Sequence, residues 1–299
     1  MNIFLDNVDL MSTSGPNHFG NKLKNSLESL GCTFGFEKPV DVQLSFISVR
    51  NRIPSVPLFL RLDGIYFNSK FDFNQQNSPI LDSYRKADGV IFQTQFNKDL
   101  IFNYFGKHHN YSIIRNGANL EFIQNIRPFN HQIISRARKI WSCASSWRPH
   151  KRLDENIRYF LEHSGPSDCL LVAGDVPREN HLKNHRIFYL GNLPIEELMS
   201  IYKVSDYFIH LAWLDHCPNV VVDALSCGCK IVCSSSGGTK EIAGEGATVI
   251  LEEEWDFSPV DLYNPPKLDF NKTSTNKLTY INDIKKVGKQ YKSFLERSL

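Results

Sequence analysis

Short apolar runs alternate along the chain with segments whose apolar residues recur at helical spacing. The runs have the length of buried strands and cover residues 1–5, 42–49, 56–62, 87–94, 111–115, 139–144, 169–173, 187–190, 207–214, 230–234 and 248–251. Between the first two runs, Phe19, Leu23, Leu27 and Leu30 form an apolar helical face that Gly31 ends. Strands that alternate with helices in this way are typical of α/β folds built on parallel sheets.

The stretch from 207 to 241 predicts two βα units in succession. Its first apolar run is followed by Pro218, where a helix should begin, and Gly228 ends that helix. Its second run ends in Gly237 and Gly238, after which a short helix is expected near Thr239. Both helix N-termini then lie at the carboxyl edge of a parallel sheet, and their unpaired N–H groups favour a phosphate-bearing ligand.

Two carboxylates occupy this stretch, eight positions apart. Asp215 lies in the turn before the helix and Asp223 lies about two turns along it, so both side chains can face the same crevice. The alternative is an ordinary βαβ unit in which the two aspartates only cap and solvate helices. The combined spacing of the aspartates, the proline and the glycines favours a binding site.

The same stretch resembles the donor domain of the GT-B glycosyltransferases of family four, also described as glycosyl transferases group 1. The matching positions are Asp215, Pro218, Asp223, Ala224, Gly228, Gly237, Gly238 and Glu241. The resemblance implies two Rossmann-like α/β domains facing a cleft, with a C-terminal helix that returns to the first domain. It also implies a retaining enzyme that moves a sugar from a nucleoside diphosphate sugar to an acceptor hydroxyl, with no cofactor.

A basic segment follows the run 139–144. The family shows an arginine and a lysine here that hold the donor diphosphate; Lys151 matches the lysine, and Arg148 is the nearest guanidinium because Ser146 occupies the arginine position. An arginine fork and a lysine charge can compensate a leaving diphosphate without a metal. The chain also contains no Asp-x-Asp pair to hold a cation on a diphosphate.

The resemblance assigns further residues. Asp215, Lys151 and Arg148 are the catalytic candidates of the second domain, and Asp223 is expected on the ribose. The remaining donor-binding candidates are Gly237, Gly238, Glu241, Gly191, Leu193, Asn219, Val220 and Gly15. Gly191 and Leu193 belong to a turn that meets the nucleotide base in relatives, whereas Gly15 matches a glycine loop after the first strand and is equally compatible with a plain helix entry.

Asp63 is the catalytic candidate of the first domain. It directly follows the run 56–62, at a place where the family commonly has a histidine beside the transferred sugar. A carboxylate there can accept hydrogen bonds from sugar hydroxyls, or it can form a simple salt bridge with Arg61. Residues 66–79, rich in Asn, Phe and Ser, are expected to form a surface loop near the acceptor, and residues 252–254 a solvated acidic turn.

The length of 299 residues favours two domains. Residues 118–138 lack periodicity and mark a linker, so the expected domains are 1–130 and 131–270, followed by a tail at 271–299. Residues 256–276 are expected to be irregular. The tail predicts an amphipathic helix whose apolar face comprises Leu278, Ile281, Ile284, Val287, Tyr291 and Leu295.

Charge and cysteine usage exclude several classes. A net charge of +2 argues against a nucleic-acid partner. Seven cysteines without a Cys-x-x-Cys pair fit a reduced compartment and match no zinc template. No basic residue precedes the first apolar run and no run approaches the length that spans a bilayer, so we expect a cytoplasmic protein with at most peripheral membrane association. Its expected partners are a nucleotide-sugar donor and a glycan, lipid or small-molecule acceptor.

Two other functions stay open at this point. Asp215 and Asp223 replace the usual glutamates, Asp63 replaces the histidine, and Lys230 stands where a proline is common. These departures are compatible with a catalytically idle relative that binds a glycan or nucleotide. A nucleotide-sugar epimerase of GT-B fold, which needs no acceptor, is the rival enzyme.

Overall fold

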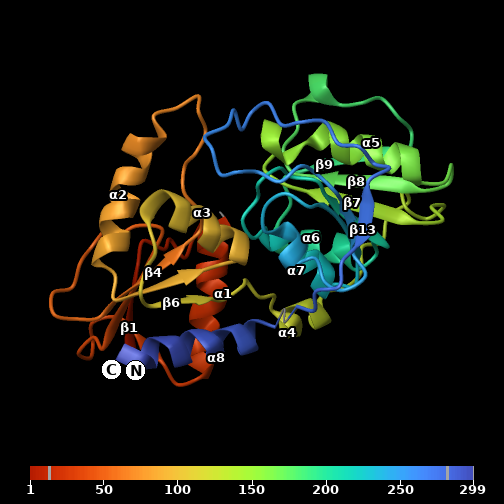
Figure 1. The fold of residues 1–299 in the computed structure, drawn as a ribbon. Coiled ribbons are helices and arrows are strands. Elements are labelled where there is room, and N and C mark those ends of the chain that lie inside the picture. The colour runs from red at the N-terminus through yellow and green to blue at the C-terminus, as the bar shows by residue number, and fades with distance from the viewer. Residues whose placement is uncertain (13–14, 281–282, 299) are drawn as a thin grey trace. The chain divides into compact units, whose positions relative to one another are not determined.

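The predicted strands assemble into two separate sheets, each covered by helices (Figure 1). The computed structural model describes residues 1–12, 15–280 and 283–298. These residues divide into two compact units. The first unit comprises Met1–Asn119, Asp256–Asp261 and the described residues of 281–299, and the second comprises Leu120–Trp255 and Leu262–Tyr280.

The sheet of the first unit is parallel throughout, with the strand order β2-β1-β3-β4-β5-β6. Its strands are β1 (Asn2–Asp6), β2 (Thr33–Phe34), β3 (Val42–Phe46), β4 (Leu58–Leu62), β5 (Gly89–Phe92) and β6 (Tyr111–Ile113). The helices of this unit are α1 (Gly15–Ser29), α2 (Phe73–Lys86), α3 (Gln95–Phe105) and α8 (Ile284–Leu295). Each predicted strand of this half is therefore present, because the apolar runs are long enough to be buried on both faces.

The sheet of the second unit has the order β13-β12-β11-β10-β7-β8-β9. Its strands are β7 (Ile140–Ala144), β8 (Cys169–Ala173), β9 (Ile187–Gly191), β10 (Tyr207–His210), β11 (Lys230–Ser234), β12 (Thr248–Ile250) and β13 (Thr273–Thr275). Its α-helices are α4 (Leu120–Asn125), α5 (Leu153–His163), α6 (Ile195–Tyr202) and α7 (Asn219–Ser226). All neighbouring strands are parallel except β13, which runs antiparallel to β12.

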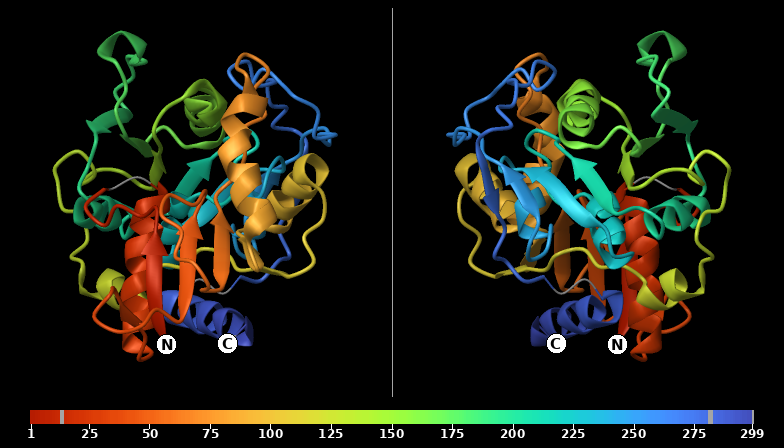
Figure 2. Two further views of the ribbon diagram at one scale, coloured as in Figure 1. Left: turned by 90° about the vertical axis from the view of Figure 1, so that its left-hand side faces the viewer. Right: turned by 90° about the vertical axis from the view of Figure 1, so that its right-hand side faces the viewer.

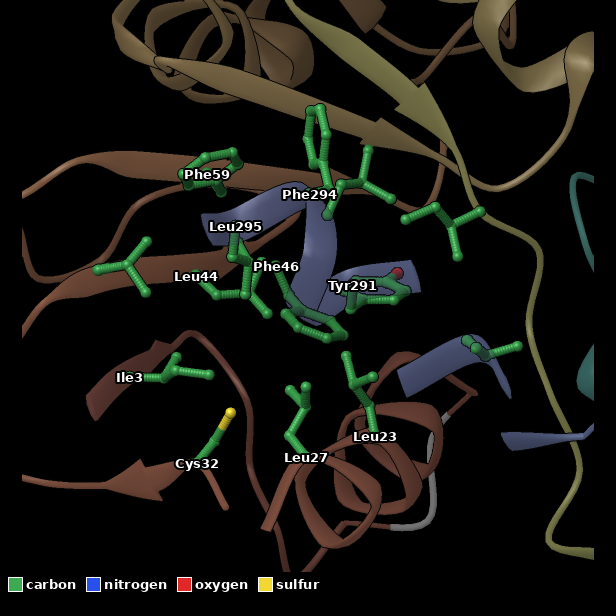
Figure 3. Packing of buried hydrophobic residues seen from close by; sticks show 14 of the residues in the cluster. Ile3, Leu23, Leu27, Cys32, Leu44, Phe46, Phe59, Tyr291, Phe294 and Leu295 are labelled. Atoms are coloured by element: carbon green, nitrogen blue, oxygen red, sulfur yellow. The ribbon is translucent and has the colours of Figure 1, made fainter. Parts of the chain in front are cut away.

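The C-terminal helix α8 packs on the first unit, beside α1 (Figure 2). Tyr291, Phe294 and Leu295 of α8 enter the same apolar cluster as Leu23 and Leu27 of α1 (Figure 3). The expectation of a two-unit α/β fold whose last helix returns to the first unit is thereby confirmed. This helix begins only at Ile284, so Leu278 lies outside it and is about half exposed. Ile281, also expected on the apolar face, lies outside the described residues.

Arg61 of β4 is the largest fully buried side chain of the first unit, and α8 helps to satisfy it. Its guanidinium lies over the rings of Phe19 and Phe46, 4.2 and 4.8 Å from their centroids. Its Nε donates to the hydroxyl of Tyr291 at 3.1 Å, and Nη2 donates to Oδ1 of Asn116 at 2.8 Å. A buried cation needs such partners, so the strand end that carries Asp63 is tied to the C-terminal helix.

The structure departs from the sequence expectations in several irregular segments. Residues 66–79 are not a loop throughout, because α2 begins at Phe73, where the Asp72 side chain accepts from the Gln75 N–H. The helix expected near Thr239 is one 3₁₀ turn. The segment 256–276, expected to be irregular, contains β13, and the expected linker contains α4.

The units also divide at positions other than those expected from the sequence. The chain leaves the first unit after Asn119, whereas the sequence places the boundary near 130. Residue Phe129 already belongs to the second unit, where its N–H donates to the carbonyl of Ser200 at 3.0 Å. The expected tail 271–299 is shared, since β13 completes the second sheet and α8 packs on the first unit.

Candidate functional site

The carboxylate of Asp215 lies in the turn after β10 and is the centre of an ionic cluster in the second unit. The ammonium of Lys151 lies 2.5 Å from its Oδ2, and Nε2 of His210 lies 2.9 Å from the same oxygen. The other oxygen, Oδ1, accepts the backbone N–H of His216 at 3.0 Å. Lys151 and Asp215, singled out from the sequence, are thus brought into direct contact although 64 positions separate them.

The backbone around Asp215 can be built only with glycine at 237. A Cβ at Gly237, whose φ is +75°, would lie 2.4 Å from the carbonyl oxygen of Asp215 and 2.8 Å from its nitrogen. The N–H of Gly238 donates to that carbonyl at 2.8 Å. Leu214 adopts a left-handed φ of +56°, a conformation that costs a residue with a side chain on the order of 1 kcal/mol. The glycine pair therefore packs against the backbone of the Asp215 turn and supports it.

This contact corrects one detail of the expected phosphate site. Because the N–H of Gly238 is occupied by the Asp215 carbonyl, Gly237 is the member of the pair that can offer its N–H to an anion. The hydroxyl of the next residue, Thr239, is fully buried and has no hydrogen-bond partner among the described residues. A buried hydroxyl without a partner is costly and is the kind of group that a ligand can satisfy.

Lys151 is fixed by the residues on either side of it. The His150 carbonyl accepts the N–H of Trp213 at 2.7 Å. The Arg152 guanidinium is buried, pairs with Glu252 at 2.6 Å and donates to the Leu211 carbonyl at 3.3 Å. The segment before α5 is therefore anchored to the turn after β10, which brings the Lys151 ammonium to Asp215.

The acidic segment 252–254 is not simply a solvated turn. Glu252 is part of the buried ion pair with Arg152, and its side chain is only 8% exposed. No local sequence pattern relates position 152 to position 252, so the sequence does not predict this pair. Breaking a buried pair by removing one partner is strongly destabilising, so Glu252 has a structural role beside the site.

Burial and charge set the protonation states of the cluster. Burial disfavours the charged form of Asp215, but Lys151 and His210 outweigh it and hold the pKa of the carboxyl well below its usual range. Burial lowers the pKa of His210, although Asp215 opposes the effect. Burial also lowers the pKa of His150 and of His216 to about 4 in each case. At neutral pH the cluster therefore combines an ionised carboxylate, one ammonium and neutral imidazoles.

The other candidates of the second unit take different positions. Asp223 is buried on α7. Burial raises the pKa of the Tyr202 hydroxyl, and the nearby Asp223 raises it further. Glu241 is buried in the 3₁₀ turn, and Asn219 and Val220 are half-buried at the start of α7. Gly191 ends β9 with φ +68° and its carbonyl accepts from Gly174, while Leu193 is half-buried in the turn that follows. Arg148 is exposed, and its carbonyl accepts the N–H of Lys151.

Asp63 and Gly15 belong to the first unit. Asp63 forms the ion pair with Arg61 that the sequence left as one alternative, and Gln93 also donates to the same carboxylate oxygen, Oδ1. Burial raises the pKa of the Asp63 carboxyl even though Arg61 opposes the effect. Its Oδ2 is buried and has no hydrogen-bond partner among the described residues. Gly15 is the first residue of α1 and is exposed.

His210 is the main site residue that sequence reasoning missed. It interrupts the apolar run 207–214, and only the structure shows that β10 ends at this residue. A polar residue inside an otherwise apolar run is the one signal that could have identified it. Among the described residues, no group of three or more His, Cys, Asp or Glu side chains is arranged to hold a metal ion. No helix in the described part of the chain is long and apolar enough to cross a membrane.

Comparison with known proteins shows what the second unit and the fold are similar to. Residues 131–256 match the family described as glycosyl transferases group 1. The crystal structure of HepE from Anabaena in complex with UDP-glucose is similar with a TM-score of 0.68 and 15% identity, over 100% of both chains. The fold is therefore that of the GT-B glycosyltransferases.

The sequence relatives are longer proteins. An uncharacterized glycosyltransferase of Methanocaldococcus jannaschii is 25% identical over 230 residues, which are 72% of this chain and 55% of that protein. The phosphatidylinositol N-acetylglucosaminyltransferase GPI3 subunit of Saccharomyces cerevisiae is 29% identical over 91 residues, or 28% of this chain and 20% of its own length. Residues 131–256 are thus similar to the group 1 glycosyltransferases, as the stretch from 207 to 241 indicated, and the chain spans about half the length of the archaeal protein.

The buried histidines predict how stability depends on pH. The folded pKa of His216, about 4, lies below its ordinary value of 6.5, so the unfolded chain binds more protons between these values. Stability should therefore fall as the pH falls from about 6.5 towards 4. Urea midpoints measured at pH 7.5 and pH 5 should differ less in His216→Asn than in the wild type. The exposed His185 provides the control, and a His185→Asn variant that shows the same reduced difference would contradict this origin.

Proposed function

We propose that this chain is a retaining glycosyltransferase that moves a sugar from a nucleoside diphosphate sugar to an acceptor hydroxyl. The observation that carries the proposal is the contact between Lys151 and Asp215 at the carboxyl edge of the second sheet, against the turn that Gly237 permits. The match of residues 131–256 to the group 1 family and the UDP-glucose bound by the HepE structure support it.

The residues divide between the two parts of the donor. Lys151, with Arg148 near it, would compensate the charge that grows on the diphosphate as it leaves, and Gly237 would add its N–H. The buried hydroxyl of Thr239, which has no hydrogen-bond partner in the described part of the chain, would add a further hydrogen bond. Asp223 would hold the ribose, and the turn at Gly191 and Leu193 would meet the base. These groups need no metal to neutralise the diphosphate.

The reaction needs no protein nucleophile. The bond between the sugar anomeric carbon and the diphosphate oxygen breaks, and its electron pair goes to the diphosphate. The acceptor oxygen then bonds to the same face of that carbon, and its proton goes to the departing phosphate. Asp215 would accept hydrogen bonds from the sugar that strengthen as the ring becomes positively charged. Asp63, in the first unit, stays a candidate for contact with sugar hydroxyls through Oδ2, which has no partner within the residues that the structure describes.

The proposal is tested with a panel of nucleotide sugars. A bound donor should raise the melting temperature, because a ligand of the native state stabilises by RT ln(1 + [L]/Kd). The stabilising donor is then used in radiolabelled form, in EDTA, with glycan, lipid and small-molecule acceptors. We expect transfer with retained anomeric configuration. Binding without transfer or hydrolysis would instead favour a recognition module, conversion of the donor alone would favour an epimerase, and activity that requires Mn²⁺ would refute metal independence.

Replacing Lys151 by alanine should lower turnover more than it weakens donor binding. Charge on the leaving diphosphate increases towards the transition state, so kcat should fall on the order of 10² to 10³. Lys230→Ala is the matched control, because Lys230 is an exposed lysine at the amino end of β11, at the opposite edge of the same sheet. Steady-state kinetics that give the Lys151 variant the turnover of the wild type would place the diphosphate elsewhere.

The two aspartates should separate kinetically. Asp223→Ala should raise the donor KM and weaken nucleoside diphosphate binding, because the ribose is remote from the reacting carbon. Asp215→Asn should lower kcat without weakening nucleoside diphosphate binding, since it removes a charge beside the sugar and releases Lys151. Donor kinetics, product affinity and melting temperature are measured on both variants. A loss of stability in both with unchanged kinetics would show that they only support the fold.

A further inference from the structure

The ligand-free site contains a conflict that donor binding must resolve. Lys151 is the ammonium proposed to receive the diphosphate, yet it contacts Oδ2 of Asp215 at 2.5 Å. A diphosphate carries more charge than a carboxylate and will compete for the ammonium. Asp215 would then lose part or all of its counter-charge just as an anion arrives, and like charges repel each other. Some other group has to keep its carboxylate in place.

His210 is placed to do this. Its ring is 4% exposed, and its Nε2 lies 2.9 Å from the same oxygen of Asp215 that Lys151 contacts. An ionised carboxylate can only accept hydrogen bonds, so Nε2 must carry the proton. A neutral N–H donor of this kind is not drawn towards the diphosphate, in contrast to a flexible ammonium.

The backbone keeps the imidazole where it is. His210 is the last residue of β10 and lies in register with Cys233 of β11. The turn that follows returns to it through the left-handed Leu214 and is supported by Gly237. The distance between ring and carboxylate is therefore set by the sheet and a rigid turn, and it does not depend on Lys151.

We propose that His210 is a positioning residue, which holds the Asp215 carboxylate towards the donor sugar while Lys151 moves to the diphosphate. This inference rests on the proposed function and adds to it a residue that the family motif does not contain. His210 does not touch the reacting atoms and acts only through Asp215.

The kinetic test compares two variants. His210→Leu removes the hydrogen-bond donor to Asp215, whereas the side-chain amide of His210→Gln can restore an N–H. The leucine variant should lose about tenfold to a hundredfold in kcat, the size of effect expected when a contact group is misplaced. Its affinity for nucleoside diphosphate should stay within about twofold, and the glutamine variant should recover most of the turnover. The exposed His185, changed to leucine, is the control and should leave kcat unaltered.

Two results would overturn the role of His210. One is a leucine variant with wild-type kcat, and the other is a glutamine variant as impaired as the leucine one at equal melting temperature. Transfer by the wild type is measured first. Absence of transfer in every form would refute the proposed function, whereas equal transfer by wild type and His210→Leu would refute only the positioning role of His210.

A measurement on the wild type covers the case in which the leucine variant does not fold. Nitrogen-15 NMR of the His210 ring and the Lys151 ammonium is recorded with and without inorganic pyrophosphate. Pyrophosphate should shift the Lys151 signal, while His210 stays neutral with its proton on Nε2. An unchanged Lys151 signal would contradict the proposed movement of Lys151 from Asp215 to the diphosphate. A His210 ring that becomes doubly protonated, or that carries its proton on Nδ1, would contradict the hydrogen bond from Nε2 to Asp215.

Discussion

The need to keep one carboxylate ionised inside the protein organises the second unit. Burial alone would raise the pKa of Asp215, yet Lys151 and His210 lower it well below its usual range. The side chains of Lys151 and Asp215 are only 18% and 14% exposed, so exchanging one of them leaves the charge of the other less compensated. The segment before α5, the end of β10 and the glycine turn all have to meet at this point.

Parallel βα topology brings these parts together. The chain segments after β7, β10 and β11 leave the sheet at its carboxyl edge, and they supply Lys151, Asp215 and Gly237 respectively. Arg152 and Glu252 then tie the segment after β7 to the segment after β12. The site is thus assembled from short connections on a rigid sheet, which suits a reaction in which the protein orients groups and supplies charge.

Sequence reasoning succeeded where local chemistry decides the structure. The apolar runs predict the strands, and the Gly-Gly pair predicts a turn at Gly237. The structure adds the reason for glycine there, which is the close approach of this position to the Asp215 backbone. It failed where distant residues meet. No local pattern predicts that Glu252 pairs with Arg152 or that His210 donates to Asp215, and β13 is a short polar strand that exists because β12 offers it an edge. The catalytic and binding roles stay predictions until the kinetics are measured.

The burial of Arg61 against Tyr291 has a consequence for biosynthesis. The guanidinium lies in a strand near the start of the chain, but the hydroxyl that satisfies its Nε belongs to α8, which follows the whole second unit in sequence. During translation the first sheet therefore emerges with a cation that it cannot yet bury at low cost. The first sheet can therefore complete its packing only after α8 has been synthesised.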